Sequence, residues 1–407
     1  MGENMVSVEI WESDVLTCPN NVNIPAVYRG KRYIIDVDPK NGIILINIDD
    51  KEIKSLGNED ENYLAREARY FVHSYYNGVV KILCAHSRSG TLVIDKITVD
   101  LASQTATRTE IKTISLSWLT RWENFAHGTS IPPRMLLLPD WDNGYMHYID
   151  IESGAIKDIN LGGTGYENEV RFSHKFFARH DDIYMAFGKH LAGSNHELLK
   201  VFSVSRHDLG FSTGGGSPRP QMFGLAVFSD KIFVPVTSGG VVGADNDLAI
   251  LDETFSQVAT IDIKGVTGIS VRANMPFGNF LAKSKDGGYY IIIGTDNGES
   301  PYEAKCVLVK FDSNFNLVTK YDIFSFTYPE GKQFMPYFEY SDITSAHVVD
   351  IDRKKVYIYA EDINGKAKFV EIDISDIWDD IEEFNARSWI IGKTRIPTIL
   401  TISVAPI

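Results

Sequence analysis

The amino-acid sequence predicts an all-β fold assembled from repeated units, and three observations support this prediction. Short runs of β-branched and aromatic residues recur through the 407-residue chain, each bounded by Gly, Asn, Asp or Pro. Aspartates lead turns between successive runs. Asn-Gly dipeptides, which suit type I′ hairpin turns because both residues must take positive φ, begin at Asn41, Asn77, Asn143 and Asn364.

The turn acids define a period. In order along the chain they are Asp49, Asp100, Asp150, a degenerate position near Ser205, Asp252, Asp312 and Asp373. Steps of roughly 50 to 60 residues match one four-stranded propeller blade with its loops. Seven such units account for nearly the whole chain, so we expect a seven-bladed β-propeller. Six blades are the alternative, because the fourth unit, 172–210, lacks its turn acid.

One unit is clearer than the others. It reads Asp286-Gly-Gly-Tyr-Tyr-Ile-Ile-Ile-Gly294 and continues with Leu308-Val-Lys-Phe-Asp312. This pattern resembles the D-G-G-Y…K-x-D repeat of many β-propellers, and Tyr148-Ile-Asp-Ile-Glu-Ser-Gly154 is similar to quinoprotein-type and YVTN-type blades. The resemblance implies architecture and no specific family. The tryptophan-docking signature of quinoprotein blades and the Gly-His…Trp-Asp signature of WD40 blades are absent, so we expect no cofactor.

We expect a single propeller domain, 1–407, whose two ends close the ring. A strand at about 6–10 should pair with a β-rich strand at about 397–404, because such a pairing removes open sheet edges. Helical turns are expected in two places. The segment 375–384 places apolar side chains on one helical face with Ser375 as N-cap, which predicts a short amphipathic C-terminal helix. The segment 59–69 is the other.

Composition narrows the function classes. Lys and Arg number 40 and Asp and Glu number 54, a net charge of −14, which disfavours nucleic acid and anionic membranes as partners. Three widely spaced cysteines argue against a disulfide framework or a zinc ribbon. The first residues lack a basic stretch and an apolar core, and no long apolar window follows. We therefore expect a soluble protein without a classical signal peptide or membrane insertion, located in the cytoplasm or in an assembled particle.

The candidate chemical motifs are incomplete, so we assign no catalytic, cofactor or metal residue. Asp140-Trp-Asp142-Asn-Gly144 resembles the start of a calcium loop, but the twelfth position is Ile151 instead of Glu, and a hairpin turn is the stronger interpretation. The ten histidines show no metal-ligand spacing. For a site at the axial mouth, the repeat offers Arg88, His147, His196 and Arg272.

Two aromatic-rich segments interrupt the strand pattern, and long segments in compact folds are often docking elements. The candidate interaction residues are Trp118, Trp122, Trp141, Phe334, Tyr337, Phe338 and Tyr340. Flat rings suit a protein or glycan interface. The alternative is that these rings pack over blade edges.

The sequence therefore favours a non-enzymatic propeller that acts as a structural or protein-interaction module in a larger assembly. Its partners would be other proteins of that assembly, with a glycan as a further candidate. With no export signal and an acidic composition, we expect this assembly to be a virus or phage particle. The alternative is a propeller enzyme or carbohydrate-binding protein with a site at the axial mouth.

Overall fold

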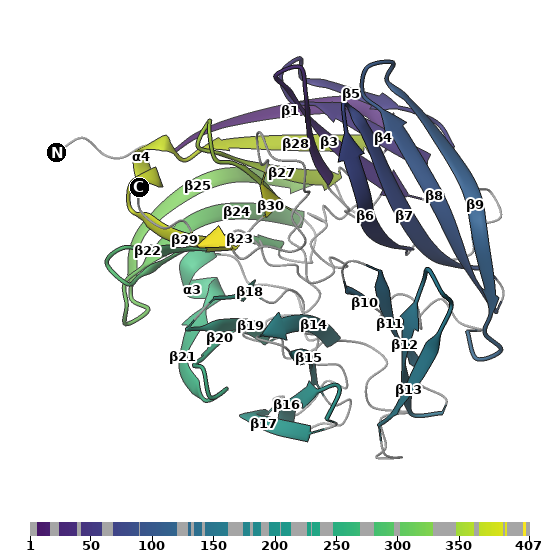
Figure 1. Cartoon of the computed structure of the whole chain (residues 1–407). Coiled ribbons are helices and arrows are strands. Elements are labelled where there is room, and N and C mark those ends of the chain that lie inside the picture. The colour runs from purple at the N-terminus through teal and green to yellow at the C-terminus, as the bar shows by residue number, and fades with distance from the viewer. Residues whose placement is uncertain are drawn as a thin grey trace.

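The computed structural model describes residues 6–16, 24–38, 42–58, 68–88, 90–119, 129–131, 134–140, 143–161, 174–179, 182–188, 195–203, 205–212, 226–228, 230–236, 247–268, 281–296, 302–328, 347–361, 366–385, 387–388 and 402–403. Their strands form antiparallel sheets arranged around a common centre (Figure 1). In each sheet the first strand lies toward the centre and the fourth on the outside, as β6 and β9 show. The predicted all-β propeller is confirmed. Six blades are built from consecutive strands, which is the alternative count and not the expected seven, and one further sheet includes the N-terminal strand.

Six blades each take four strands from one continuous stretch of chain. Blade 1 contains β2 (Ile24–Tyr28), β3 (Lys31–Asp38), β4 (Gly42–Asn47) and β5 (Glu52–Ser55). Blade 2 contains β6 (Ala68–Tyr76), β7 (Val79–Arg88), β8 (Thr91–Asp100) and β9 (Thr105–Ser115). Blade 3 contains β10 (Thr129–Ile131), β11 (Met135–Asp140), β12 (Tyr145–Asp150) and β13 (Ile156–Asn160).

Blade 4 contains β14 (His174–Arg179), β15 (Asp182–Gly188), β16 (Asn195–Lys200) and β17 (Ser205–Ser212), so the unit that lacks a turn acid still forms its own sheet. Blade 5 contains β18 (Ala226–Val227), β19 (Ile232–Val236), β20 (Asp247–Leu251) and β21 (Gln257–Asp262). Blade 6 contains β22 (Leu281–Ser284), β23 (Tyr289–Asp296), β24 (Tyr302–Phe311) and β25 (Leu317–Tyr328).

A further sheet, the closing blade, combines both ends of the chain. It contains β26 (His347–Asp350), β27 (Lys355–Glu361) and β28 (Lys366–Asp373), and its outer strand is the N-terminal β1 (Ser7–Leu16). The register runs from Ser7 opposite Asp373 to Leu16 opposite Lys366. The N-terminal strand therefore pairs with β28 and not with 397–404 as expected. From that expected strand, β31 (Ile402–Ser403) pairs with β29 (Ile381–Asn385), and its other residues lie outside the described ranges.

The predicted C-terminal helix is correct for its first turn only. Helix α4 covers Ser375–Trp378, and Ile377 is buried between blade 6 and the closing blade. Its N-cap residue is Ile374 instead of Ser375, and Asp373 accepts a hydrogen bond from the Ser375 amide. Beyond it the chain forms β29, because the free inner edge of β22 offers a partner for an extended segment. Of 59–69, only the last two residues are described, and they begin β6.

One helix was not predicted. Helix α3 covers Ile263–Thr267 and follows β21 directly. Asp262 caps it by accepting a hydrogen bond from the Gly265 amide at 3.0 Å. Gly268 ends it with a φ of 79°, a left-handed conformation that glycine adopts without steric cost.

The turn acids have a local role that explains their period. Asp100, Asp150, Asp252 and Asp312 each accept hydrogen bonds through Oδ1 from backbone amides two to four residues ahead. The carboxylate thereby fixes the turn between the third and fourth strands of its blade. A hydrogen bond from the Thr254 hydroxyl is the main reason that the pKa of Asp252 lies below 3.8. The Asn316 side chain lowers the pKa of Asp312 in the same way.

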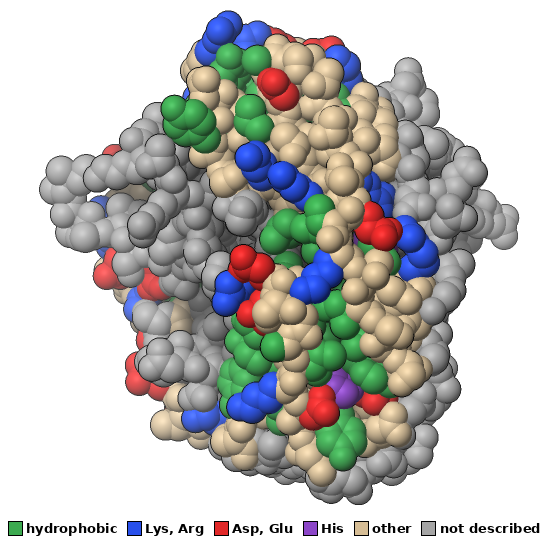
Figure 2. Space-filling view, turned by 45° about the vertical axis from the view of Figure 1, so that its right-hand side comes forward, with side chains coloured by type: hydrophobic (Ala, Val, Ile, Leu, Met, Phe, Trp, Pro, Cys, Tyr) green, Lys and Arg blue, Asp and Glu red, His purple; other side chains and the backbone are tan. Residues whose placement is uncertain are grey.

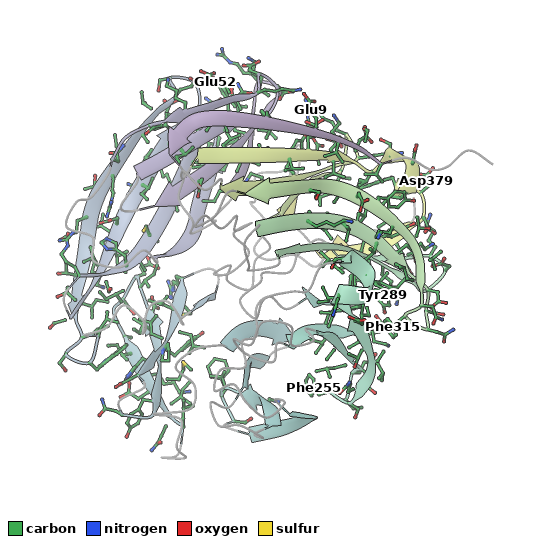
Figure 3. All side chains as sticks on the ribbon, turned by 180° about the vertical axis from the view of Figure 1, so that it is seen from behind. Glu9, Glu52, Phe255, Tyr289, Phe315 and Asp379 are labelled. Carbon is green, nitrogen blue, oxygen red and sulfur yellow. The ribbon has the colours of Figure 1, made fainter. Side chains whose placement is uncertain are left out.

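The described core lies between blades, as blade 1 shows. All six residues of β4 are buried, and odd and even positions face different neighbours: Ile43 and Leu45 pack with blade 2, and Ile44 and Ile46 pack with the closing blade. Aromatic rings fill the junction of blades 5 and 6. Tyr289 and Phe315 stack there at 5.7 Å, as Figure 3 shows from behind.

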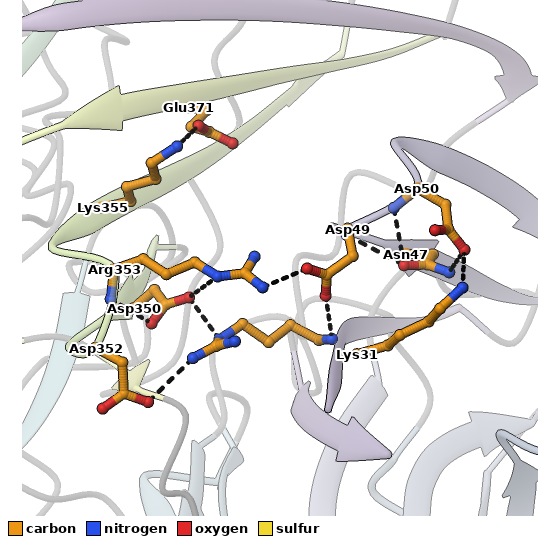
Figure 4. Close-up of polar contacts among 10 residues, drawn as sticks. Lys31, Asn47, Asp49, Asp50, Asp350, Asp352, Arg353, Lys355 and Glu371 are labelled. Carbon is orange, nitrogen blue, oxygen red and sulfur yellow. Dashed lines mark hydrogen bonds and ion pairs between the residues drawn. The ribbon is translucent and has the colours of Figure 1, made fainter. Parts of the chain in front are cut away.

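Charged groups join blade 1 to the closing blade (Figure 4). Arg32 Nε lies 2.6 Å from Asp350 Oδ2 and its Nη2 lies 3.0 Å from Asp352 Oδ2, while Arg353 contacts Asp49. Burial raises the pKa of Asp350 above 3.8. Burial also tends to raise the pKa of Asp49. Hydrogen bonds from the Arg32 amide and the Arg353 guanidinium outweigh this effect and hold the pKa of Asp49 below 3.8.

Candidate interaction site at the loop-bearing end

Strand order divides the propeller into two unlike ends. At one, the tight-turn end, two to five residues join the first strand of a blade to the second and the third to the fourth. At the other, the loop-bearing end, segments of up to 18 residues join successive blades, as 329–346 does between β25 and β26. Long connections carry function more often than tight turns do, because their residues do not have to pair within a sheet and can vary in sequence.

The predicted interaction residues all belong to connections that start and finish at the loop-bearing end. Trp118 follows β9, the outer strand of blade 2, and is described. The other six lie outside the described residues: Trp122, Trp141, Phe334, Tyr337, Phe338 and Tyr340. Each of their segments leaves one strand and enters the next at the loop-bearing end: β9 to β10, β11 to β12, and β25 to β26. The sequence distance between 118 and 340 is therefore no measure of their separation in space.

Trp118 belongs to a compact polar cluster between blades 2 and 3. Its indole stacks on the imidazole of His147 with the ring centroids 4.0 Å apart and the planes 16° from parallel. The half-buried indole also packs against the apolar core of this junction. The side that brings β9 and β13 forward shows a histidine among acidic and hydrophobic side chains (Figure 2). We call Trp118, Asp140, His147 and Asp158 the Trp118 cluster.

Strand register brings the cluster together. Leu138, His147 and Asp158 are partners across β11, β12 and β13, so the imidazole and the Asp158 carboxylate share one sheet face. His147 Nδ1 lies 2.8 Å from Asp158 Oδ1, and its Nε2 lies 3.5 Å from Asp140 Oδ2. Each ring nitrogen thus faces a carboxylate, and the Trp118 indole stacks on the face of the ring.

Asp140 is the first acid of the calcium-loop pattern, and Asp142, the second, lies outside the described residues. Asp140 Oδ1 accepts from the Asn143 amide at 3.3 Å and its Oδ2 accepts from Asn143 Nδ2 at 2.8 Å. These contacts link Asp140, the last residue of β11, to Asn143, which precedes β12. Within the described ranges, no group of three or more His, Cys, Asp or Glu side chains is arranged to hold a metal ion.

A second histidine cluster lies in blade 2 and was not predicted. His86 is fully buried, and its Nε2 lies 3.0 Å from Asp95 Oδ2, which also accepts from Arg108 Nε at 2.6 Å. Burial acts upward on the pKa of Asp95, but the hydrogen bond from His86 and the charge of Arg108 outweigh it and bring that pKa below 3.8. His86, Asp95 and Arg108 lie on three consecutive strands joined by short turns. Their spacing in the sequence could therefore have identified this cluster.

The axial candidates are not brought together by the described part of the chain. Arg88 lies on the second strand of blade 2 and pairs with Glu110 at 3.0 Å, toward the outside. His147 lies on the third strand of blade 3. The His196 side chain and Arg272 lie outside the described residues. Among the helices that are described, none is long and apolar enough to cross a membrane.

Comparisons with known proteins add likenesses of fold. No protein-family model matches the chain, and no curated protein matches it. Among solved structures, it resembles the extracellular domain of a hybrid two-component system from B. thetaiotaomicron at 13% identity and a TM-score of 0.42, over 86% of this chain and 40% of that one. It also resembles the WD40 domain of SCAP from fission yeast, at 8% identity and a TM-score of 0.44, over 92% of this chain and 100% of that one.

A GH74 enzyme from Niastella koreensis gives 12% identity and a TM-score of 0.43, over 75% of this chain and 46% of the enzyme. The chain thus spans less than half the length of the first and third of these proteins. The class of protein, a β-propeller, rests on the chain's own strand pairing.

Proposed function

We propose that this β-propeller is a non-enzymatic structural or protein-interaction module of a larger assembly, and that its partners dock at the loop-bearing end. The observation that carries the proposal is the division of the ring into a tight-turn end and a loop-bearing end. All seven candidate interaction residues belong to connections at the loop-bearing end. Rings of Trp and Tyr supply large contact area at low cost in conformational entropy.

The Trp118 cluster supports docking over catalysis. An indole that stacks on an imidazole whose Nδ1 is hydrogen-bonded to Asp158 is fixed in place before a partner arrives, and such preorganisation favours binding. Asp158 exposes 60% of its side chain beside this indole and can accept a hydrogen bond from a partner. A protein partner therefore gains both an aromatic and a polar contact here.

Partner capture with paired variants tests the proposal. The double variant Tyr337→Ala, Phe338→Ala and the single variant Trp118→Ala should each lower capture of partner proteins from the natural source by about tenfold or more, the effect of one interface hot spot. Tyr76→Ala is the matched control, because Tyr76 is 76% exposed but lies at the tight-turn end. Equal capture by all variants would contradict docking at the loop-bearing end.

The native mass of the protein from its natural source separates the assembly from the alternative. A large particle with many copies would support a structural module and would test the proposed virus or phage particle directly. A free monomer would contradict the assembly and favour a propeller enzyme or carbohydrate-binding protein with an axial site. Loss of turnover after a single axial His or Arg change would then establish the enzyme.

A further inference from the structure

The C-terminal part of the chain adds strands to the inner side of two blades. In blade 6 the first strand, β22, pairs with β29 on the side away from β23. In the closing blade the first strand, β26, pairs in parallel with β30 (Arg387–Ser388). Because β22 and β26 are the first strands of their blades, β29 and β30 lie on the inner edges of two neighbouring blades.

The attachment is strong at α4 and weaker beyond it. Ile374 and Ile377 are buried between blade 6 and the closing blade, which anchors α4. The last polar anchor is Asp380, whose Oδ2 accepts from the Tyr290 hydroxyl at 2.8 Å and from Lys310 Nζ at 2.7 Å. Its carbonyl accepts from the Lys285 amide.

After Asp380 the chain is held to β22 by four register pairs, which run from Ser284 opposite Ile381 to Leu281 opposite Asn385, and on its other side it pairs with β31 at two positions. Glu383 is 6% exposed and stands opposite Lys283. Short ladders near a chain end open more readily than long ones, because few contacts are lost at a time.

We propose that the inner edge of β22 is a strand-binding site, which β29 fills in this structure and which an extended segment of a partner protein takes when β29 leaves. Main-chain ladder bonds would provide affinity, as in other cases of strand addition. Recognition would come from an acid at the position of Asp380, read by Tyr290 and Lys310, and a second acid at the position of Glu383, opposite Lys283. The partner segment is therefore extended and acidic, with an apolar residue at the position of Ile381, which packs against the core between blade 6 and the closing blade. This site includes none of the seven candidate interaction residues, so either proposal can fail alone.

The experiment uses the full chain and a fluorescein-labelled peptide of its own sequence, 375–385, as the probe. The wild-type protein should bind the probe weakly, because β29 competes. The double variant Asp380→Ala, Ile381→Pro loosens β29 and leaves β22 unchanged, since it removes the polar anchor and prevents one ladder position from donating a hydrogen bond. We expect it to bind the probe at least tenfold more tightly in fluorescence anisotropy.

Neighbouring tyrosines provide the matched control in the double-variant background. Tyr290→Phe removes the hydroxyl that Asp380 of the probe would use, and should weaken probe binding roughly tenfold, the effect of a lost hydrogen bond to a charged group. Tyr289→Phe should not, because the Tyr289 hydroxyl contacts Asp230 instead. Equal effects of the two substitutions would overturn the assignment of the site.

Hydrogen exchange of the β22 amides checks that the site opens. Faster exchange in the double variant without probe binding would overturn the proposal. Unchanged exchange would overturn it as well, because β29 would then not be displaceable.

Discussion

The two ends of the chain both add a strand to a distant sheet, but they do so with unequal strength. β1 is the outer strand of the closing blade, and its register with β28 includes seven residue pairs. β29 lies on the inner side of blade 6 with four pairs to β22 and two to the short strand β31. The N-terminal strand thus completes a blade, whereas the C-terminal strand extends one that is already complete. The comparison teaches that ring closure rests on β1 and the charges around it, and that β29 can be lost at a smaller cost.

The largest expected effect is at the junction that ring closure creates. Arg32→Met should lower the free energy of unfolding by about 3 to 5 kcal/mol, because it leaves the buried Asp350 carboxylate without its 2.6 Å partner. Chemical denaturation measures the loss. Lys31→Met is the control: its pair with Asp50 is about half exposed and should contribute under about 1 kcal/mol. Equal losses would show that the buried pair does not hold the junction.

The second prediction concerns packing of the N-terminal strand. Trp11→Ala should cost about 3 kcal/mol, because the indole makes an edge-to-face contact with Phe369 at 5.0 Å and packs against the core between blade 1 and the closing blade. Thermal and urea unfolding measure it. Glu9→Ala on the same strand should cost under about 1 kcal/mol, since its ion pair with Lys51 is exposed. A cost for Trp11→Ala no larger than that for Glu9→Ala would contradict the role given to β1.

Local features of this fold could be predicted from the sequence, whereas pairings between distant segments could not. The turn acids were identified because a carboxylate that accepts nearby backbone amides leaves a signal within a few residues, as at Asp252 and Asp312. The strand at about 6–10 was predicted, but its partner was wrong, because 397–404 is rich in β-branched residues whereas 366–373 contains only Val370 and Ile372. The ion pair of Arg32 with Asp352 spans 320 positions, and no sequence pattern indicates it.

The candidate site divides in the same way. Trp118 was identified from aromatic clustering, but its partner His147 was considered only for an axial site, because the stacking depends on how blades 2 and 3 pack. In the segment 375–384, helical periodicity was a sound local signal for α4. It failed beyond Trp378 because pairing of β29 with β22 is a tertiary contact that overrides local propensity.

A smaller effect tests the C-terminal side of the comparison. Asp380→Ala should cost about 1 to 2 kcal/mol, because it removes the acceptor for Tyr290 and Lys310 while Ile377 still anchors α4. Hydrogen exchange should rise at β22 and remain unchanged at β27 and β28. A rise at β27 and β28 of the same size would mean that the C-terminal segment holds the closing blade as firmly as β1 does.

The smallest effect is a dependence on pH beside the same segment. Hydrogen bonds from Lys310 and Ser284 lower the pKa of Asp286 from 3.8 to about 2. A depressed folded-state pKa adds stability that is present above the unfolded value and is lost as pH falls from about 4 toward 2. Because this side chain is 55% exposed, we expect the contribution to be under about 1 kcal/mol.

Urea unfolding at pH 5 and pH 3 should show that the free energy of unfolding falls less on acidification in Asp286→Asn than in the wild type. Asp379→Asn, 94% exposed, is the control that should behave as the wild type does. If Asp286→Asn retains the full acid loss, the contact with Lys310 does not couple this turn to stability.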